Sequence, residues 1–225
     1  MLIDDNTTYY VSDFNGTIFI LNDSWEYIDQ KAFIKPAYML TFDQYIYIAA
    51  DKNIFKTDKY LNILNQYNYS GETPSYRGIY HNSTCNLLFV TAGALELIQV
   101  FDMNLFLIAN ESISTSPYHP RSITGYENRL YVGVATNGTI LVIVNKRIIS
   151  LIYSCDGKHY TITSILYDQS GQLATTCEED SHFYLHLNGS FTGKKFSSKG
   201  NAEYIGFDSK RNFIIISTSE INIYS

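Results

Sequence analysis

The stretch Arg129-Leu130-Tyr131-Val132-Gly133-Val134-Ala135-Thr136-Asn137-Gly138-Thr139-Ile140-Leu141-Val142-Ile143 decides the fold of this chain. Residues 130–134 are rich in β-formers and predict one strand, and residues 139–144 predict a second. Asn137-Gly138 lies between them and is a hairpin turn signal, because both residues tolerate a positive φ. Segment 9–20 has the same shape and the same Asn-Gly-Thr-Ile core, so the hairpin is repeated.

The repeat has a nearly constant period. Strand-like runs are anchored on Val11, Ile48, Val90, Val132, Thr175 and Ile216, with steps of 37, 42, 42, 43 and 41 residues. A period of about 40 residues with several short strands per repeat is typical of β-propeller blades. We therefore predict one all-β propeller domain of four-stranded antiparallel blades, with units at approximately 1–34, 35–74, 75–117, 118–158, 159–200 and 201–225. Six blades are expected, and five closed blades with leftover strands are the alternative.

Packing explains why such units would stack. A single four-stranded sheet has two apolar faces and cannot bury both alone, so blades are expected to pack face to face around an axis. Small residues suit the crowded inner strands, where Gly78, Gly125 and Gly206 occur. The last run of each unit is the most polar, as expected of an outer strand; in the third unit this run is Leu105–Ile108.

Charge and hydropathy narrow the function. The net charge is −6 and no run of Lys or Arg exceeds two residues, so binding to nucleic acid is not expected. No segment approaches the roughly 18 consecutive apolar residues that span a bilayer, so no direct membrane insertion is expected. Residues 1–5 lack the basic and apolar regions of a signal peptide. We expect a monomeric domain of a larger secreted or membrane-attached chain that needs no cofactor.

One unit resembles a known repeat family. Segment 36–54 runs from a proline through an apolar strand, an acid and a turn into Tyr47-Ile48-Ala49-Ala50-Asp51-Lys52-Asn53-Ile54, which is similar to an NHL-type repeat. Segment 11–18 looks similar, whereas segments 91–94 and 217–220 depart from the pattern. The resemblance implies a six-bladed propeller that acts as a binding platform. In a minority of related propellers it implies a metal-dependent lactone hydrolase or lyase.

Asn-x-Ser/Thr sequons are dense in this sequence. A random arrangement of the same residues would give about three, whereas eight are present, starting at Asn6, Asn15, Asn22, Asn68, Asn82, Asn110, Asn137 and Asn188. The excess predicts a glycosylated, extracellular protein. The alternative is a cytoplasmic protein in which Asn-Gly-Thr and Asn-Gly-Ser serve only as turn chemistry.

The three cysteines allow one covalent cross-link. Cys155 follows the fourth strand of one predicted unit, and Cys177 ends the second strand of the next. A disulfide between them would join neighbouring blades. The alternative is two small buried thiols. Cys85 lies on a turn without an obvious partner and is expected to be free.

The candidate binding residues lie where each predicted inner strand begins. In a propeller these positions face one mouth of the central channel, and here they are Tyr38, Tyr76, Arg77, Arg121, Thr163 and Tyr204. We call them the strand-start set. Tyr and Arg are enriched at binding hot spots, so we predict that Tyr38, Tyr76, Arg77, Arg121 and Tyr204 dock a protein or a small polar or anionic ligand. The alternative is that the tyrosines fill space and the arginines pair with neighbouring acids.

The rival function is a cation-dependent hydrolase or lyase with its metal in the channel. That chemistry needs several Asp, Glu, Asn or His side chains to converge on the axis. The predicted inner strands offer Glu203 and little else. The acidic run Glu178-Glu179-Asp180 is interpreted as a solvated hairpin tip. The expectation is therefore a non-catalytic interaction module without a metal.

Overall fold

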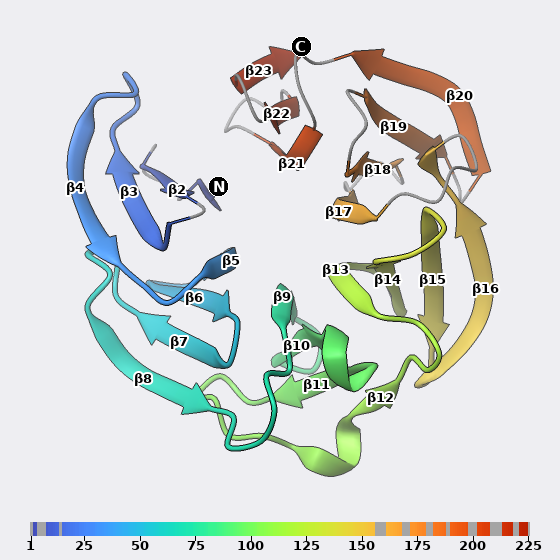
Figure 1. Ribbon diagram of the computed structural model, residues 1–225, viewed down its shortest axis with the longest axis horizontal. Helices are drawn as coiled ribbons and strands as arrows, with labels where there is room; N and C mark the ends of the chain where they lie inside the picture. Colours follow the sequence, from blue (N-terminus) through green and yellow to red (C-terminus); the bar gives the residue numbers. More distant parts are fainter. Residues whose placement is uncertain are drawn as a thin grey trace. The chain divides into compact units, whose positions relative to one another are not determined.

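The computed structural model describes residues 2–3, 8–13, 15–155, 161–167, 172–178, 182–187, 190–197, 202–207, 213–217 and 221–224. The chain divides into two compact units, Met1–Ser112 and Ile113–Ser225. Each unit is an array of antiparallel sheets whose strands follow one another in chain order (Figure 1).

The strands of the first three sheets come largely from the first unit. The first sheet contains β1 (Leu2–Ile3), β2 (Tyr9–Ser12), β3 (Thr17–Leu21) and β4 (Tyr27–Ala32). The second contains β5 (Pro36–Phe42), β6 (Tyr45–Ala50), β7 (Asn53–Thr57) and β8 (Ile63–Asn68). The third contains β9 (Tyr76–Asn82), β10 (Leu87–Ala92), β11 (Leu97–Phe101) and β12 (Ile113–Ser114), with the short 3-10 helices η1 (Gly93–Leu95) and η2 (Ala109–Glu111).

The second unit supplies the remaining sheets. The fourth contains β13 (Pro120–Tyr126), β14 (Arg129–Val134), β15 (Thr139–Val144) and β16 (Arg147–Tyr153). The fifth contains β17 (Ile162–Tyr167), β18 (Gln172–Cys177), β19 (His182–Leu187) and β20 (Ser190–Ser197). The sixth contains β21 (Ala202–Phe207), β22 (Phe213–Ser217) and β23 (Ile221–Tyr224).

The prediction of four-stranded antiparallel blades is confirmed, but the prediction of six such blades is wrong. Within the described residues five sheets have four strands, which is the count of the alternative prediction. The last repeat contributes a sheet of only three strands, β21–β23. A periodic anchor strand marks a repeat even where the repeat does not supply a fourth strand, and the period alone therefore overcounts complete blades.

The deciding hairpin forms as predicted. β14 and β15 pair in antiparallel register, with Gly133 opposite Ile140. Asn137 and Gly138 have φ values of 63° and 55°, the conformation for which this pair of residues is suited. Gly16 in the equivalent hairpin has a φ of 97°.

The hydrophobic core lies between successive sheets, as the two-faced blades require. In the first unit, Tyr10 and Ile18 of the first sheet pack in one buried cluster with Met39 and Ile48 of the second. In the second unit, Tyr131 and Ile140 share a cluster with buried residues of β17, β18 and β19. Each sheet therefore depends on its neighbour for burial of its apolar face.

Three turns of the first unit, each of which connects the third and fourth strands of a repeat, share one geometry. They start at Asn22, Asp58 and Asp102, whose side-chain oxygens accept hydrogen bonds of 2.8–3.0 Å from the backbone N–H groups two and four residues later. The residue three positions later has a φ of 61–64°. A large side chain rarely adopts this conformation, so the side-chain hydrogen bonds stabilise it. The residues concerned are Trp25, Leu61 and Leu105.

This turn corrects the predicted fourth strand of the third unit. Leu105–Ile108 does not form a strand: Leu105 has a positive φ and belongs to the turn, and no strand directly follows this turn as β4 and β8 follow the other two. A single bridge joins Phe101 to Leu107, and the sheet is completed by the two-residue strand β12.

Close packing of β14 on β17 gives a testable prediction. A Cβ atom added at Gly133 would lie 2.4 Å from Ile162 Cγ2 and 2.5 Å from Ser122 Oγ. We expect Gly133→Ala to lower the free energy of unfolding by about 2 kcal/mol, measured by urea denaturation, because a buried methyl group without space forces its neighbours apart. Gly71→Ala is the control, since Gly71 is exposed and its added Cβ would meet only the Tyr69 ring. Equal effects of the two substitutions would contradict this packing.

Candidate functional site

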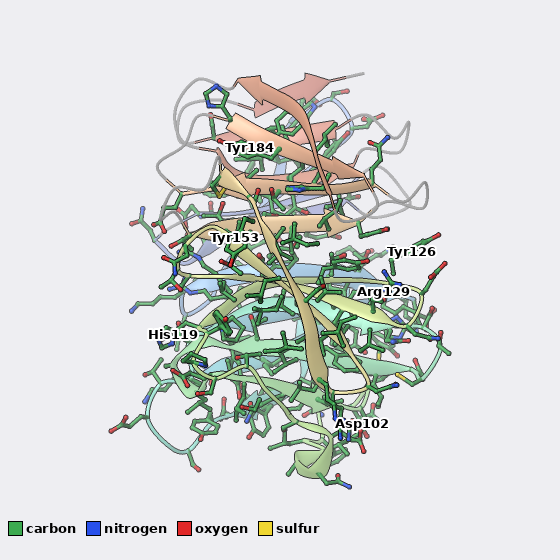
Figure 2. All side chains as sticks on the ribbon, turned by 90° about the vertical axis from the view of Figure 1, so that its right-hand side faces the viewer. Asp102, His119, Tyr126, Arg129, Tyr153 and Tyr184 are labelled. Carbon is green, nitrogen blue, oxygen red and sulfur yellow. A yellow bond between two sulfur atoms is a disulfide. The ribbon has the colours of Figure 1, made fainter. Side chains whose placement is uncertain are left out.

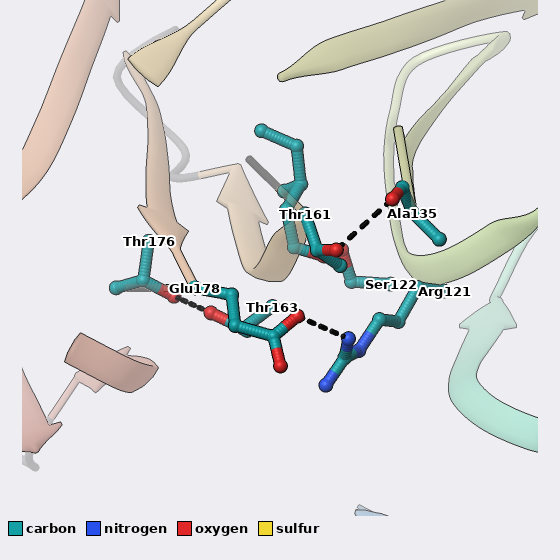
Figure 3. A network of polar contacts seen from close by, with 8 residues as sticks. Arg121, Ser122, Ala135, Thr161, Thr163, Thr176 and Glu178 are labelled. Carbon is teal, nitrogen blue, oxygen red and sulfur yellow. Dashed lines mark hydrogen bonds and ion pairs between the residues drawn. The ribbon is translucent and has the colours of Figure 1, made fainter. Parts of the chain in front are cut away.

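A polar network of the second unit lies where β13 and β17 begin and β18 ends (Figure 3). Its centre is an ion pair in which Arg121 Nη1 lies 2.9 Å from Glu178 Oε2. The two side chains are 27% and 42% exposed, so water screens part of their attraction. The ion pair therefore fixes the position of the guanidinium but contributes little to the stability of the fold.

Hydroxyl groups accompany this ion pair. Thr163 Oγ1 lies 2.9 Å from Thr176 Oγ1, and Thr161 Oγ1 donates to the backbone oxygen of Ala135 at 3.0 Å. The network therefore combines a carboxylate acceptor, a guanidinium donor and threonine hydroxyls. These groups come from β13, β17 and β18 and from the residues directly next to β17 and β18. Such groups can hydrogen-bond a peptide or another polar ligand.

Figure 2 distinguishes the two ends of the fourth sheet. His119, immediately before β13, lies on one side of the second unit, and Arg129, the first residue of β14, lies on the other. Tyr126, at the end of β13, is on the same side as Arg129. The strand-start end that carries Arg121 is therefore opposite the β13–β14 turn.

Arg121 was predicted to help dock a polar or anionic ligand, with pairing to a neighbouring acid as the alternative. In the structure the carboxylate of Glu178 pairs with its guanidinium. Glu178 is partly exposed in the turn that directly follows β18, and its carboxylate reaches Arg121, 57 residues earlier. Glu179 and Asp180 lie outside the described residues.

The first unit contributes Tyr38, Tyr76 and Arg77 to the strand-start set. Arg77 is exposed on β9, whereas Tyr76 is fully buried and its hydroxyl donates to Gln99 Oε1. Burial raises the pKa of Tyr76 above its ordinary value. Adjacent residues of a strand point to opposite faces, so Tyr76 and Arg77 do not serve one surface. Tyr76 is a core residue, and we remove it from the binding set.

Tyr38 and Tyr204 are partly buried. Tyr38 packs against the hydrophobic cluster shared by the second and third sheets. The Tyr204 ring lies along its own strand β21, since a Cβ added at Gly206 would be 2.9 Å from it. Both rings thus pack against their own unit and leave only part of their surface for a ligand.

A pocket of about 710 Å³ in the first unit was not indicated by any sequence pattern. It lies between β2 of the first sheet and two turns of the second, at the end of β5 opposite Tyr38. Its walls are Tyr10, Thr41, Phe42, Asp43, Gln44, Tyr45, Ile46, Asp58, Lys59 and Tyr60. This volume is typical of a small-molecule site.

The predicted disulfide is confirmed. Cys155 and Cys177 are bonded, with their Cα atoms 6.0 Å apart, and both are fully buried. Cys85 is exposed and free. The bond joins the second residue after β16 to the end of β18, so it cross-links the fourth and fifth sheets.

A buried polar cluster lies next to this disulfide in sequence. His186 Nε2 lies 3.2 Å from Ser154 Oγ and 3.4 Å from Thr175 Oγ1, and the two hydroxyls are 2.8 Å apart. Burial lowers the pKa of His186 to about 4. All three side chains are buried, so the cluster stabilises neighbouring strands and does not offer a reactive group to solvent.

Six of the eight sequon asparagines lie in the described residues, and none of these six is buried. Asn22 and Asn82 each use their side-chain oxygen in a turn. Asn15, Asn68, Asn110 and Asn137 are exposed. Asn6 and Asn188 lie outside the described residues.

Two features are absent from the described residues. No group of three or more His, Cys, Asp or Glu side chains gathers there as a metal site would require. Within the same residues, no helix combines the length and hydropathy needed to cross a bilayer.

No family model and no curated protein matches this chain. Among solved structures 1059 chains match, and one is the WD40 domain of Neurospora crassa Pan2. Its TM-score is 0.73 at 9% identity, and the match covers 99% of this chain and 73% of that one. The likeness shows a β-propeller fold, whereas the NHL-type resemblance is not confirmed. So widespread a fold does not select a function.

Proposed function

We propose that this chain is a non-catalytic protein-interaction module. WD40-like propellers suggest such a role, and the observation that carries it here is an apolar stripe on an outer strand. Ile149, Leu151 and Tyr153 alternate along β16 and are 57%, 37% and 62% exposed. Leu151 and Tyr153 are alternate residues and share one face of the strand. Ile149 lies at the β-bulge that precedes them, so three exposed apolar side chains follow one another along β16. Exposed stripes of this kind mark protein contacts.

We propose two separate polar surfaces, one in each unit. In the second unit the surface consists of Arg121, Glu178 and the hydroxyl of Thr163. In the first unit it consists of Arg77 and the exposed part of Tyr38. These groups can pair with the backbone and polar side chains of a bound segment. The ion pair of Arg121 with Glu178 favours a polar partner in the second unit.

The test begins with a partner captured from extract by the wild-type chain and identified by mass spectrometry. We expect the double variant Ile149→Ser/Leu151→Ser to weaken binding of that partner at least about tenfold, because an apolar contact is lost. The matched control is Ile63→Ser/Leu64→Ser, which removes two exposed apolar side chains from β8. Equal losses in the two variants would indicate nonspecific adhesion and contradict the assignment to β16.

Arg77→Ala tests the polar surface with the same partner. We expect it to weaken binding by about 1–3 kcal/mol, the usual range for a hydrogen bond to a charged group that is removed. Arg129→Ala is the control, because Arg129 is exposed but starts β14 at the opposite end of its blade. Unchanged affinity of Arg77→Ala would move the interface away from the strand-start end.

We further propose an oxidising, extracellular or secretory environment. The support is the buried disulfide together with the eight sequons. After expression through a secretory pathway, we expect mass that a glycan-removing enzyme takes away, with Asn15 and Asn68 among the modified residues because their side chains are exposed. Intact-mass and peptide mass spectrometry measure this. Bare sequons throughout would point to the cytoplasm instead.

A further inference from the structure

We infer that the outer edge of β16 binds an extended peptide segment of a partner protein by strand addition. The inference rests on the proposed function, because it names the kind of partner that the apolar side chains of β16 contact. β16 is the last strand of the fourth sheet, whose order is β13-β14-β15-β16 (Figure 1). One side of β16 pairs with β15, and the other side is therefore an edge of the sheet.

The register of β15 and β16 identifies the backbone groups at this edge. The N–H of Ser154 donates to the backbone oxygen of Gly138 at 2.7 Å, so the backbone groups of Ser154 face β15. In an antiparallel pair, successive residues direct these groups to alternate sides. The N–H and C=O groups of Leu151 and Tyr153, which come three residues and one residue earlier, therefore face outward. Within the described residues, no turn or loop supplies a backbone partner for them.

The side chains beside these outward groups are apolar and accessible. Leu151 and Tyr153 share one face of the strand and are 37% and 62% exposed. A β-branched residue opposite an aromatic residue is a favourable cross-strand pair. An added strand with apolar residues at alternate positions would bury both side chains while its backbone pairs with the outward groups.

The other outer strands of the four-stranded sheets are protected against such pairing. β4 carries Asp29 and Lys31, and β20 carries Lys194 and Lys195. Charged residues of this kind keep an edge strand from pairing with another chain. β12 has only two residues, and β8 is covered at Asn65, whose side-chain amide donates to the turn that follows β11. β16 has seven residues and a single charge, at its first residue.

That charge indicates the composition of the added strand. Arg147 is exposed, and within the described residues no carboxylate forms an ion pair with it. Lys146 precedes it in the turn between β15 and β16. A strand added in the more stable antiparallel direction brings its C-terminal end to this basic turn, where an acidic residue is complementary. The partner segment is thus an extended run of two alternate apolar residues followed by an acid.

The probe is the fluorescein-labelled peptide Ser-Val-Thr-Val-Thr-Asn-Thr-Glu with an amidated C-terminus, and fluorescence anisotropy measures its affinity for the purified chain. Its valines are placed opposite Tyr153 and Leu151, so their N–H groups face β16 and those of the first two threonines face solvent. N-methylation of both valines should weaken binding at least about tenfold, because two backbone hydrogen bonds are lost.

The matched control is N-methylation of the first two threonines, which should leave the affinity nearly unchanged because their N–H groups have no partner in the complex. Equal losses in the two methylated peptides overturn the proposal. Absence of binding by the unmodified peptide also overturns it.

Two variants of Leu151 separate the backbone contact from the side-chain contact. A proline at an edge position whose N–H faces solvent removes no hydrogen bond of the sheet, so Leu151→Pro should fold but lose an outward donor. Leu151→Ala loses the same side chain, keeps the donor, and should bind the peptide about fivefold more tightly than Leu151→Pro. Urea denaturation checks that both variants are folded. Equal affinities of the two folded variants contradict strand addition, and the methylated peptides decide the question if Leu151→Pro does not fold.

Arg147→Gln tests the acidic end of the segment. The wild-type chain should prefer the peptide about threefold over a version with glutamine in place of the glutamate, the usual range of an exposed ion pair. Arg147→Gln should lose this preference. An unchanged preference in the variant contradicts the direction assigned to the added strand.

The partner captured from extract distinguishes this inference from the proposed function. If Ile149→Ser/Leu151→Ser loses that partner while Leu151→Pro and Leu151→Ala bind it equally, β16 is a protein interface and strand addition is wrong. If Ile149→Ser/Leu151→Ser keeps the partner while the peptide results hold, strand addition stands and the assignment of that partner to β16 fails. Analytical ultracentrifugation of the chain alone tests the remaining occupant: a dimer that Leu151→Pro abolishes would place a second copy on this edge and overturn the proposal of a partner peptide.

Discussion

Replacing both Cys155 and Cys177 by serine is expected to lower the free energy of unfolding by about 3 kcal/mol. The bond closes a loop with a sequence separation of 22 residues, and opening it returns conformational entropy to the unfolded chain. Both cysteines are also fully buried, between sheets that depend on each other for their core. Urea denaturation with and without a reducing agent measures the effect.

Two controls separate the cross-link from other consequences of reduction. Cys85→Ser should leave stability unchanged, because its thiol is exposed and free. The double variant should be insensitive to the reducing agent. If the wild-type denaturation midpoint is the same under both conditions, the two cysteines contribute only as small buried side chains.

Lowering the pH from 7 to 5 is expected to cost about 2 kcal/mol of stability through His186 alone, and about 3 kcal/mol by pH 4. Burial holds the pKa of His186 at about 4 in the folded state, whereas an unfolded histidine titrates near 6.5. Between pH 6.5 and about 4, His186 therefore binds a proton in the unfolded chain but stays neutral in the folded chain. The contribution is complete above pH 6.5, falls as the pH drops, and levels off below about 4.

The measurement is the free energy of unfolding at several pH values for wild type and for His186→Gln. The variant should lose the pH dependence between 7 and 5, although it will be less stable at pH 7 because the hydroxyls of Ser154 and Thr175 must find a new partner. His119→Gln, an exposed position, should keep the wild-type slope. Parallel curves for wild type and His186→Gln would contradict the buried, neutral imidazole.

Local sequence determined the repeat and the cross-link. Strand periodicity and Asn-Gly turns act over a few residues, so the hairpin of β14 and β15 follows from residues 129–144. Cys155 and Cys177 were predictable partners because each lies at a strand end in consecutive repeats, and neighbouring repeats pack together. The same logic predicted four strands per blade but could not count complete blades, because an anchor strand recurs with or without its fourth strand.

Within the candidate site, a residue could be predicted from the sequence only where its position in the repeat determines whether its side chain is exposed. Arg77 is exposed as expected, but Tyr76 beside it is buried, because adjacent strand residues face opposite ways and only the packed sheets decide which way is inward. The turn at Leu105 was missed because the apolar run gives no sign that the Asp102 carboxylate accepts hydrogen bonds from the backbone N–H groups of Asn104 and Phe106.

Only the tertiary structure decided the charge around Arg121 and the presence of the pocket in the first unit. Arg121 is neutralised by Glu178, 57 residues away, and the pocket wall joins Tyr10 to Lys59, 49 residues away. Sequence patterns report the face of an element on which a residue lies, whereas an ion pair or a cavity depends on the distance between elements. That distance is set by the side chains packed between the sheets, and hence by the whole fold.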